Sequence, residues 1–354
     1  MNILVLSREF PPHVLGGISY HLTNLYNKIA DRGHEVTVLG GKCPQSWDEL
    51  ADEVSDQIKT IPVEFGYRKG YYVLYPLALR KKIHDIDTSR FDIAIAHTPI
   101  PYTIPGLPLV TKYHDCTPMT RKYMRKSLST SDKIGDSLLQ PFRTVINNRS
   151  FKVSDYAIFN STVNMSGWEE KYSIECPQEI IYNGVDTSKF YPVESSKRDG
   201  VLFVGDSNQK GLKSVIRYAD SNHRPVHIVG DVDIAHSNIV CHGRVHQDRL
   251  RELYSQSAVT VHPAHFESFG NVVVESLACG TPVVTTSSCG ASEVLTDEAG
   301  VVTTNIKSGV KKASNLNAED CVSIARQYSW STVAKRTIKI FKQVITSCAN
   351  PAGL

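Results

Sequence analysis

Short runs of apolar residues alternate with longer stretches in which apolar positions recur at helical spacing. In the first half of the chain we predict strands at Ile3–Leu6, Glu35–Leu39, Phe91–Ala96, Leu109–Tyr113, Tyr156–Phe159 and Glu179–Tyr182. Helices are predicted from about Ile18 to Asp31 and from about Lys133 to Lys152. The apolar runs are continuous in Val, Ile and Leu, which is typical of strands covered by helices on both faces.

The pattern restarts after a polar stretch near 187–200, TSKFYPVESSKRDG. Here the predicted strands are Val201–Val204, Val226–Val229, Ile239–Cys241, Val259–His262 and Pro282–Thr285. They alternate with helices near 211–220, 247–256 and 271–279. Strand–helix alternation indicates a parallel sheet in each half. The predicted fold class is therefore α/β, with two Rossmann-like, doubly wound domains.

In such sheets, ligands bind beyond the carboxyl ends of the strands, so we expect the loops after Leu6, Val204 and His262 to carry the chemistry. The first loop has Gly16 and Gly17 at a helix start, which suits a phosphate or sugar close to the backbone or, equally, a tight turn. A GxGxxG fingerprint is absent from the first two loops, which argues against a nicotinamide cofactor.

The second loop, VLFVGDSNQKGLKSVI, has a single lysine, Lys210, which can reach a diphosphate but, on sequence alone, is equally well a solvated side chain. Its Gly205 allows a turn, and Gly211 lies at the entry to the next helix.

The third loop, HFESFGNVVVESLACGTPVV at 265–284, has a glutamate on each side of a predicted helix start near Asn271. The N–H groups at such a start bind a pyrophosphate well. Glu275 shares a helical face with Asn271 and can accept hydrogen bonds from two ribose hydroxyls, while Glu267 precedes the helix and can bind a sugar. The order fits a nucleotide sugar. From spacing alone, an unrelated loop charge and an exposed helix residue remain the alternative.

This segment resembles the Glu–seven–Glu motif of the family 4 retaining glycosyltransferases, which have the GT-B fold. Further segments are similar to that family in the expected order: the Gly16-Gly17 loop, TKYHD at 111–115, SDYAIFNST at 154–162, IYNGVDTSKFYP at 181–192, VGDSNQKG at 204–211, CHGRV at 241–245, PVVTTSSCGASEVL at 282–295 and YSWSTVAKRTIKIF at 328–341. The resemblance covers nearly the whole chain. It implies an acceptor-binding domain at 1–190, a nucleotide-sugar domain at 191–329, a central cleft, and a C-terminal helix at about 330–348 that packs back on the first domain.

The resemblance also implies roles for single residues. Catalytic roles fall to His114, Glu267 and Lys210, although a structural histidine at a strand end is the alternative for His114. The implied donor-binding residues are Gly16, Gly17, Lys210, Arg244, Val245, Glu267, Ser268, Phe269, Gly270, Asn271 and Glu275. Among these, Glu275 holds the ribose, and Arg244 and Val245 lie near the base. Glu293 is expected to orient a neighbouring loop.

Family members retain the anomeric configuration without an obvious protein nucleophile, and a donor phosphate oxygen takes the acceptor proton. No metal or other cofactor is implied, and we interpret Asp231-Val232-Asp233 as a loop rather than a metal motif. One departure stands out: Asp206 occupies the position at which the family commonly has an arginine, so the diphosphate loses a bidentate partner.

The composition indicates where the protein is found and which kinds of partner it can bind. With 41% hydrophobic and 21% charged residues the chain reads as globular, and we expect a cytoplasmic protein without a secretory leader or spanning segment. Eight cysteines without a CxxC pair favour reduced thiols. Basic residues crowd two stretches, at 66–82 (including Arg68 and Lys69) and 121–152 (including Lys126). They form either solvated faces or a surface for an anionic partner such as the inner face of a membrane or a phosphorylated acceptor; no nucleic-acid motif accompanies them.

The predicted function is transfer of a hexose-type sugar from a nucleoside-diphosphate sugar, with UDP as first choice and GDP as second, to a hydroxyl acceptor such as a glycan or lipid-linked saccharide. Two alternatives stay open. A nucleotide-sugar epimerase would need an acid–base set for which His114, Asp115 and Glu267 are the visible candidates. A non-catalytic nucleotide-sugar-binding protein would explain Asp206.

Overall fold

A computed structural model describes residues 1–14, 16–42, 50–65, 71–125, 129–194 and 198–350. The chain forms two compact units, each of which is described by itself. The N-terminal unit comprises Met1–Asn160, Met165–Ile181 and the segment from Val333 onward, and the C-terminal unit comprises Ser161–Asn164 and Tyr182–Thr332. Arg68, Lys69 and Lys126 of the two basic stretches lie outside the described residues.

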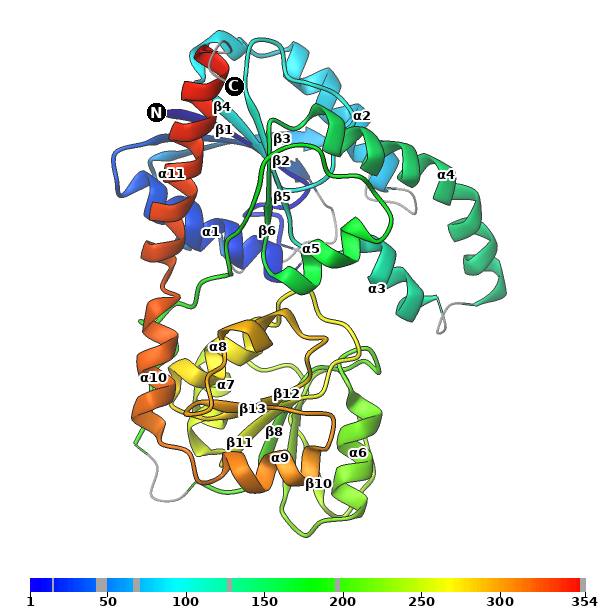
Figure 1. Cartoon of the computed structure of the whole chain (residues 1–354), viewed down its shortest axis with the longest axis vertical. Helices are drawn as coiled ribbons and strands as arrows, with labels where there is room; N and C mark the ends of the chain where they lie inside the picture. Colours follow the sequence, from blue (N-terminus) through cyan, green and yellow to red (C-terminus); the bar gives the residue numbers. More distant parts are fainter. Residues whose placement is uncertain (15, 43–49, 66–70, 126–128, 195–197, 351–354) are drawn as a thin grey trace. The chain divides into compact units, whose positions relative to one another are not determined.

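The N-terminal unit is built on a seven-stranded, all-parallel sheet in the order β3-β2-β1-β4-β5-β6-β7 (Figure 1). The strands are β1 (Asn2–Ser7), β2 (Glu35–Lys42), β3 (Ile58–Glu64), β4 (Ile93–Ala96), β5 (Leu109–Tyr113), β6 (Tyr156–Phe159) and β7 (Gln178–Ile180). The helices are α1 (Gly17–Ala30), α2 (Tyr71–His84), α3 (Thr117–Met124), α4 (Thr130–Val153), α5 (Thr162–Glu169) and α11 (Trp330–Ala349), with short 3₁₀ turns at Ala51–Glu53 and Thr88–Arg90; α5 and α11 each begin in the other unit.

The C-terminal unit has a six-stranded, all-parallel sheet in the order β10-β9-β8-β11-β12-β13. Its strands are β8 (Val201–Val204), β9 (Val226–Val229), β10 (Ile239–Cys241), β11 (Val259–His262), β12 (Val283–Thr285) and β13 (Gly300–Val302). Its helices are α6 (Leu212–Asp220), α7 (Gln247–Gln256), α8 (Asn271–Ala278), α9 (Ile306–Ala313) and α10 (Ala318–Gln327), with a 3₁₀ turn at Gly290–Val294.

Helices cover both faces of the C-terminal sheet, so its strands are buried on both sides. One apolar cluster joins the sheet to α7, α8 and α10, and another joins it to α6 and α9. Burial on both sides explains why these strands are rich in Val and Ile and do not alternate regularly between apolar and polar residues. The predicted fold class, two doubly wound parallel sheets, is confirmed.

Strand order places the functional loops. In the C-terminal unit the direction of winding reverses between β8 and β11, and in the N-terminal unit it reverses between β1 and β4. A crevice opens at such a switch point, beyond the carboxyl ends of the two strands. The loops that follow Val204 and His262, which we predicted to carry the chemistry, therefore leave the C-terminal sheet from neighbouring strands.

Candidate functional site

The loops after β8 and β11 are fastened to each other. The side chain of Gln209 donates to the carbonyl of Phe266 at 3.1 Å, and the N–H of His265 donates to the carbonyl of Gln209 at 2.8 Å. At Gly211, which has φ +98° and caps α6, an added Cβ would lie 2.3 Å from the carbonyl oxygen of Pro263. This close backbone approach holds Lys210, the neighbour of Gly211, against the second loop.

The start of α8 requires a glycine. Gly270 is the N-cap residue with φ +96°, a conformation that side chains rarely adopt, and an added Cβ would lie 2.8 Å from Sγ of Cys289. Asn271 begins the helix, and its N–H and that of Val272 precede the N–H of Val273, which donates to the carbonyl of Gly270 at 3.0 Å. A helix N-terminus with free N–H groups is suited to a phosphate.

Glu267 lies just before this helix start. Its Oε2 is 3.7 Å from Nε2 of His262, the last residue of β11, and its backbone is fixed by hydrogen bonds to Ser288 and Gly290. Burial by itself would raise the pKa of the Glu267 carboxyl, but contacts with His262, the charge of Lys210 and the N–H of Ser268 outweigh it and lower that pKa. Glu267 is therefore an ionised acceptor at neutral pH.

Glu275 lies one turn into the same helix and behaves differently. The hydroxyl of Tyr254, a buried residue of α7, donates to its Oε2 at 3.1 Å. Burial raises the pKa of Glu275 to about 7, although the Tyr254 hydrogen bond and the charge of Lys210 act in the opposite direction. Its protonation state consequently changes near neutral pH.

Lys210 links the two carboxylates, because its charge lowers the pKa of both. Both glutamates are partly buried rather than exposed. One cation, two carboxylates and the α8 N-terminus therefore form a single electrostatic cluster at the switch point, which favours the one-site interpretation over two unrelated surface charges.

The NGVD segment braces this cluster. The Asn183 amide donates to Oδ1 of Asn271 at 2.9 Å, and the N–H of Val185 donates to the carbonyl of Tyr328. The sequence predicted no contact for Asn183 of NGVD, and it did not indicate His262 or Tyr254 as site residues. The end of a strand signals His262, but nothing local in the sequence signals Tyr254.

The other predicted donor-binding residues differ in exposure. Ser268 is buried and accepts a hydrogen bond from Ser161 at its carbonyl, and Phe269 belongs to the core. Val245 packs on the same core, whereas Arg244 is exposed and lies 3.8 Å from Asp231. Asp231 thus has a cation as its neighbour, in the loop that follows β9.

Asp206, at the family's arginine position, is exposed. No ion pair or hydrogen bond of its side chain is found among the residues that the structure describes. The acid therefore turns to solvent rather than occupying the cluster around Lys210.

Glu293 orients a neighbouring loop, as predicted. Its carboxylate accepts hydrogen bonds from the N–H of Thr162 at 3.0 Å, the N–H of Val163 at 3.0 Å and the hydroxyl of Tyr182 at 3.1 Å. These N–H groups belong to the start of α5, so Glu293 stabilises a helix N-terminus.

We expect Glu293→Ala to lower the free energy of unfolding by about 1–3 kcal/mol, because it leaves two helix N–H groups and a tyrosine hydroxyl without their charged acceptor. Urea denaturation measures the change. Glu194→Ala, at an exposed glutamate of the same unit, is the matched control and should be neutral. Equal behaviour of the two variants would contradict this role.

In the N-terminal unit, His114 ends a buried relay. The Tyr26 hydroxyl lies 2.5 Å from Nε2 of His97, and Nδ1 of His97 lies 2.7 Å from Nε2 of His114. With the tyrosine as donor, each histidine carries its hydrogen on Nδ1. Burial and then the charge of Lys112 lower the pKa of His114 well below its ordinary value, so its ring is neutral at pH 7.

His114 and Lys112 line a cavity of about 140 Å³ together with Arg8 and Tyr72. Lys112 is fully buried, and its amine has no hydrogen-bond partner among the described residues. Ile18 lines the same cavity and directly follows Gly16 and Gly17, so the start of α1, where Gly16 is the N-cap residue, lies beside this cavity.

Comparisons with known proteins agree with this architecture. Residues 15–189 match the profile described as Glycosyltransferase Family 4, and residues 198–317 match that of Glycosyl transferases group 1. The chain is 25% identical to a glycogen synthase of Mycobacterium tuberculosis (96% of this chain, 94% of the relative) and 27% identical to a phosphatidyl-myo-inositol mannosyltransferase of Mycolicibacterium smegmatis (94% and 91%). It is similar in structure to Anabaena HepE in complex with UDP-glucose, with a TM-score of 0.70, 17% identity, and coverage of 97% of this chain and 100% of HepE.

Proposed function

The chain belongs to glycosyltransferase family 4, whose members are retaining enzymes with nucleotide-sugar donors, and on that premise we propose that it transfers a hexosyl group from a UDP-sugar to a hydroxyl acceptor. The cluster of Lys210, Glu267 and Glu275 around the α8 N-terminus carries this proposal, because it combines a cation, two hydroxyl acceptors and free N–H groups at one switch point.

The proposed roles follow from the charge of each group. Lys210 and the N–H groups from Phe269 to Asn271 stabilise the diphosphate as the glycosidic bond breaks. Positive charge from these groups does the work of a metal ion, so we expect transfer without one. The ionised Glu267 accepts hydrogen bonds from the transferred sugar, and Glu275 accepts from the ribose hydroxyls.

We assign the remaining predicted residues to the same donor. Gly16 and Gly17 approach it with backbone N–H groups, Arg244 and Val245 lie near the base, and Ser268 supports the loop of Glu267. His114 serves as a neutral hydrogen-bonding partner of the transferred sugar, because its lowered pKa removes the charge. These roles rest on the family resemblance together with the charge states described above.

UDP is the first choice of donor, supported by the HepE complex, and GDP is the second. For the acceptor we propose a glycan or lipid-linked hydroxyl; the mannosyltransferase relative is named for a phosphatidyl-inositol substrate. Binding and hydrolysis of UDP-, GDP- and ADP-sugars test the proposal. Failure of every donor to bind would reject it, and binding without hydrolysis or transfer would favour the non-catalytic alternative that Asp206 keeps open.

Donor affinity should depend on the ionisation of Glu275. Since its pKa is about 7, we expect the affinity for UDP-glucose to fall as the pH drops from 8 to 6, when the protonated carboxyl loses acceptor capacity. Glu275→Gln should bind the donor about tenfold more weakly than the wild type does at pH 8, the effect of losing one such pair of hydrogen bonds. Its affinity should not depend on pH over this range. Calorimetric titration at several pH values measures both. An unchanged affinity in Glu275→Gln would remove Glu275 from the ribose site.

We place the protein in the cytoplasm, associated peripherally with the inner face of an anionic membrane. Among the described residues no helix is both long and apolar enough to cross a bilayer. The basic stretches supply the charge for a surface association instead.

A further inference from the structure

Helix α4 of the N-terminal unit presents an apolar face to solvent. Ile134, Leu138, Phe142 and Val145 are 56–69% exposed, although each is a residue normally covered in a globular protein. Their spacing of four, four and three residues puts them on one side of the helix. Leu74 and Leu77 of α2, a helix that packs against α4, are also exposed. Most of the large apolar side chains exposed in the described chain therefore belong to this pair of helices.

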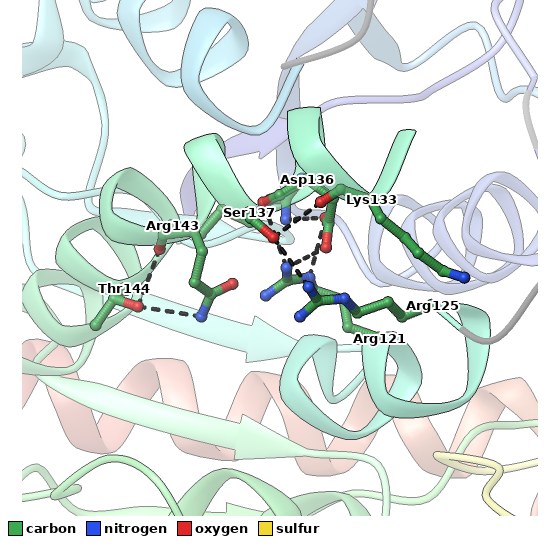
Figure 2. A network of polar contacts seen from close by, with 8 residues as sticks. Arg121, Arg125, Lys133, Asp136, Ser137, Arg143 and Thr144 are labelled. Atoms are coloured by element: carbon green, nitrogen blue, oxygen red, sulfur yellow. Dashed lines mark hydrogen bonds and ion pairs between the residues drawn. The ribbon is translucent and has the colours of Figure 1, made fainter. Parts of the chain in front are cut away.

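The opposite face of α4 faces the protein and is mostly polar, with Phe151 as its one fully buried apolar side chain. Figure 2 shows Arg121 reaching from α3 to the carboxylate of Asp136, which Arg143 also contacts. Farther along, the Asn147 amide donates to the hydroxyl of Tyr172 at 3.2 Å, and the Ser150 hydroxyl lies 2.9 Å from that of Tyr113.

The polarity of α4 is thus the reverse of that of an ordinary surface helix, which buries its apolar stripe and exposes its charges. Hydrogen bonds, ion pairs and the buried ring of Phe151, which packs on Tyr113 and Trp168, hold α4 to the unit, and the apolar stripe from Ile134 to Val145 stays uncovered. Contiguous exposed apolar side chains on a protein of this kind mark a surface that is covered by a partner.

The charge around this surface selects the partner. The basic residues of α2, α3 and α4 are Arg80, Lys81, Lys82, Arg121, Lys122, Lys133, Arg143, Arg149 and Lys152. Their acidic residues are Asp132 and Asp136, and Asp136 is neutralised by Arg121 and Arg143. Arg149 and Lys152 continue the exposed face of α4 past its apolar part. An anionic lipid surface can bury the apolar stripe and attract the basic side chains at the same time. A second copy would instead bring the same basic groups together at a shared interface, where they repel one another.

We propose that the exposed face of α4, with Ile134, Leu138, Phe142 and Val145 inserted between lipid headgroups and Arg149 and Lys152 on anionic phosphates, is the element that docks this protein on a membrane. The inference deepens the peripheral association proposed above and rests on it for the partner, but it is independent of the donor and of the transfer reaction. The docking surface is then one face of one helix, whereas the basic residues of the sequence are spread over two stretches.

Vesicle sedimentation tests the proposal with the full chain. We expect binding to phosphatidylcholine vesicles that contain about one third phosphatidylglycerol, and weak binding to phosphatidylcholine alone. Leu138→Glu should weaken binding to the anionic vesicles about tenfold or more, because it puts a charge into the inserted stripe. Arg149→Gln with Lys152→Gln should remove most of the preference for anionic lipid. Val302→Glu, an equally drastic change at an exposed valine of the C-terminal unit, is the matched control.

Each outcome decides the matter. Equal binding by Leu138→Glu and the wild type, or no binding of the wild type to anionic vesicles, overturns the proposal. A dimer in sedimentation velocity that Leu138→Glu dissociates would instead assign the face to a second copy. UDP-glucose titration of the same samples separates the two proposals: loss of vesicle binding with intact donor binding concerns α4 alone, and absent donor binding with intact vesicle binding rejects the proposed function alone.

Discussion

Lys210→Ala is expected to lower the rate of sugar transfer by about 10²- to 10³-fold, the effect of removing one preorganised group that stabilises charge in a transition state. Lys210 is the cation whose charge reaches both Glu267 and Glu275. The neighbouring Asp206 turns to solvent and offers the leaving diphosphate no substitute. Because charge on the diphosphate grows as the glycosidic bond breaks, we expect the turnover number to fall more than the donor affinity.

Lys213→Ala is the matched control for this prediction, since Lys213 is an exposed lysine only three residues further along the chain. It should transfer sugar at nearly the wild-type rate. Steady-state kinetics with UDP-glucose and a suitable acceptor, or donor hydrolysis without one, provide the measurement. If Lys210→Ala kept a nearly normal turnover number, the diphosphate site would have to lie elsewhere in the unit.

The C-terminal sheet could be predicted closely because its pattern is unambiguous. The strands Val201–Val204, Val226–Val229 and Val259–His262 have the bounds expected, since short β-branched runs followed by Gly or Pro leave few alternatives. By contrast, β3 (Ile58–Glu64) was not predicted, because a proline and charges interrupt its apolar pattern. Nor was the helix α2, whose sequence contains Pro76.

Some residues of the candidate site could likewise be predicted from the sequence, and others could not. Glu267, Gly270 and Glu275 were found because they flank one helix start in a short stretch of sequence. Tyr254 and His262 were missed because each reaches its glutamate through the tertiary fold, from a helix and from a strand end. Sequence spacing also gives no access to charge states: burial raises the pKa of both carboxyls, and only Glu267 has the contacts with His262 and the N–H of Ser268 that outweigh it.

The basic stretch at 121–152 shows a further limit of sequence reasoning. Counted along the chain, Arg121 and Arg143 are two of its many cations. In the structure both form ion pairs with Asp136, where α3 meets α4. The charge available to a partner is therefore smaller than the count implies, and the apolar stripe on the other side of α4 carries information that a charge count misses.

Lys112→Met should stabilise the protein by about 2–4 kcal/mol at pH 7, because burial of a charged amine without a partner costs several kcal/mol. Burial, and to a lesser extent the charge of Arg336, lower the pKa of Lys112 from 10.5 to about 7 in the folded state. The cost of the lysine is present in full below pH 7, where both states carry the proton. It disappears as the pH rises to 10.5, where both states are neutral.

The advantage of Lys112→Met should therefore shrink as the pH rises above 7, by at most about 1.4 kcal/mol for each pH unit. Urea denaturation at pH 6, 8 and 9.5 measures this slope, which an apolar packing effect alone would not produce. Lys59→Met, at an exposed strand lysine of the same unit, should show neither gain nor slope. A pH-independent gain would mean that the pKa of Lys112 is the same in the folded and unfolded states, and would contradict a cost from burial of its charge. The lowered pKa values of His97 and His114 should rise in the same variant, because the Lys112 charge contributes to both, so histidine titration followed by NMR reports the charge directly.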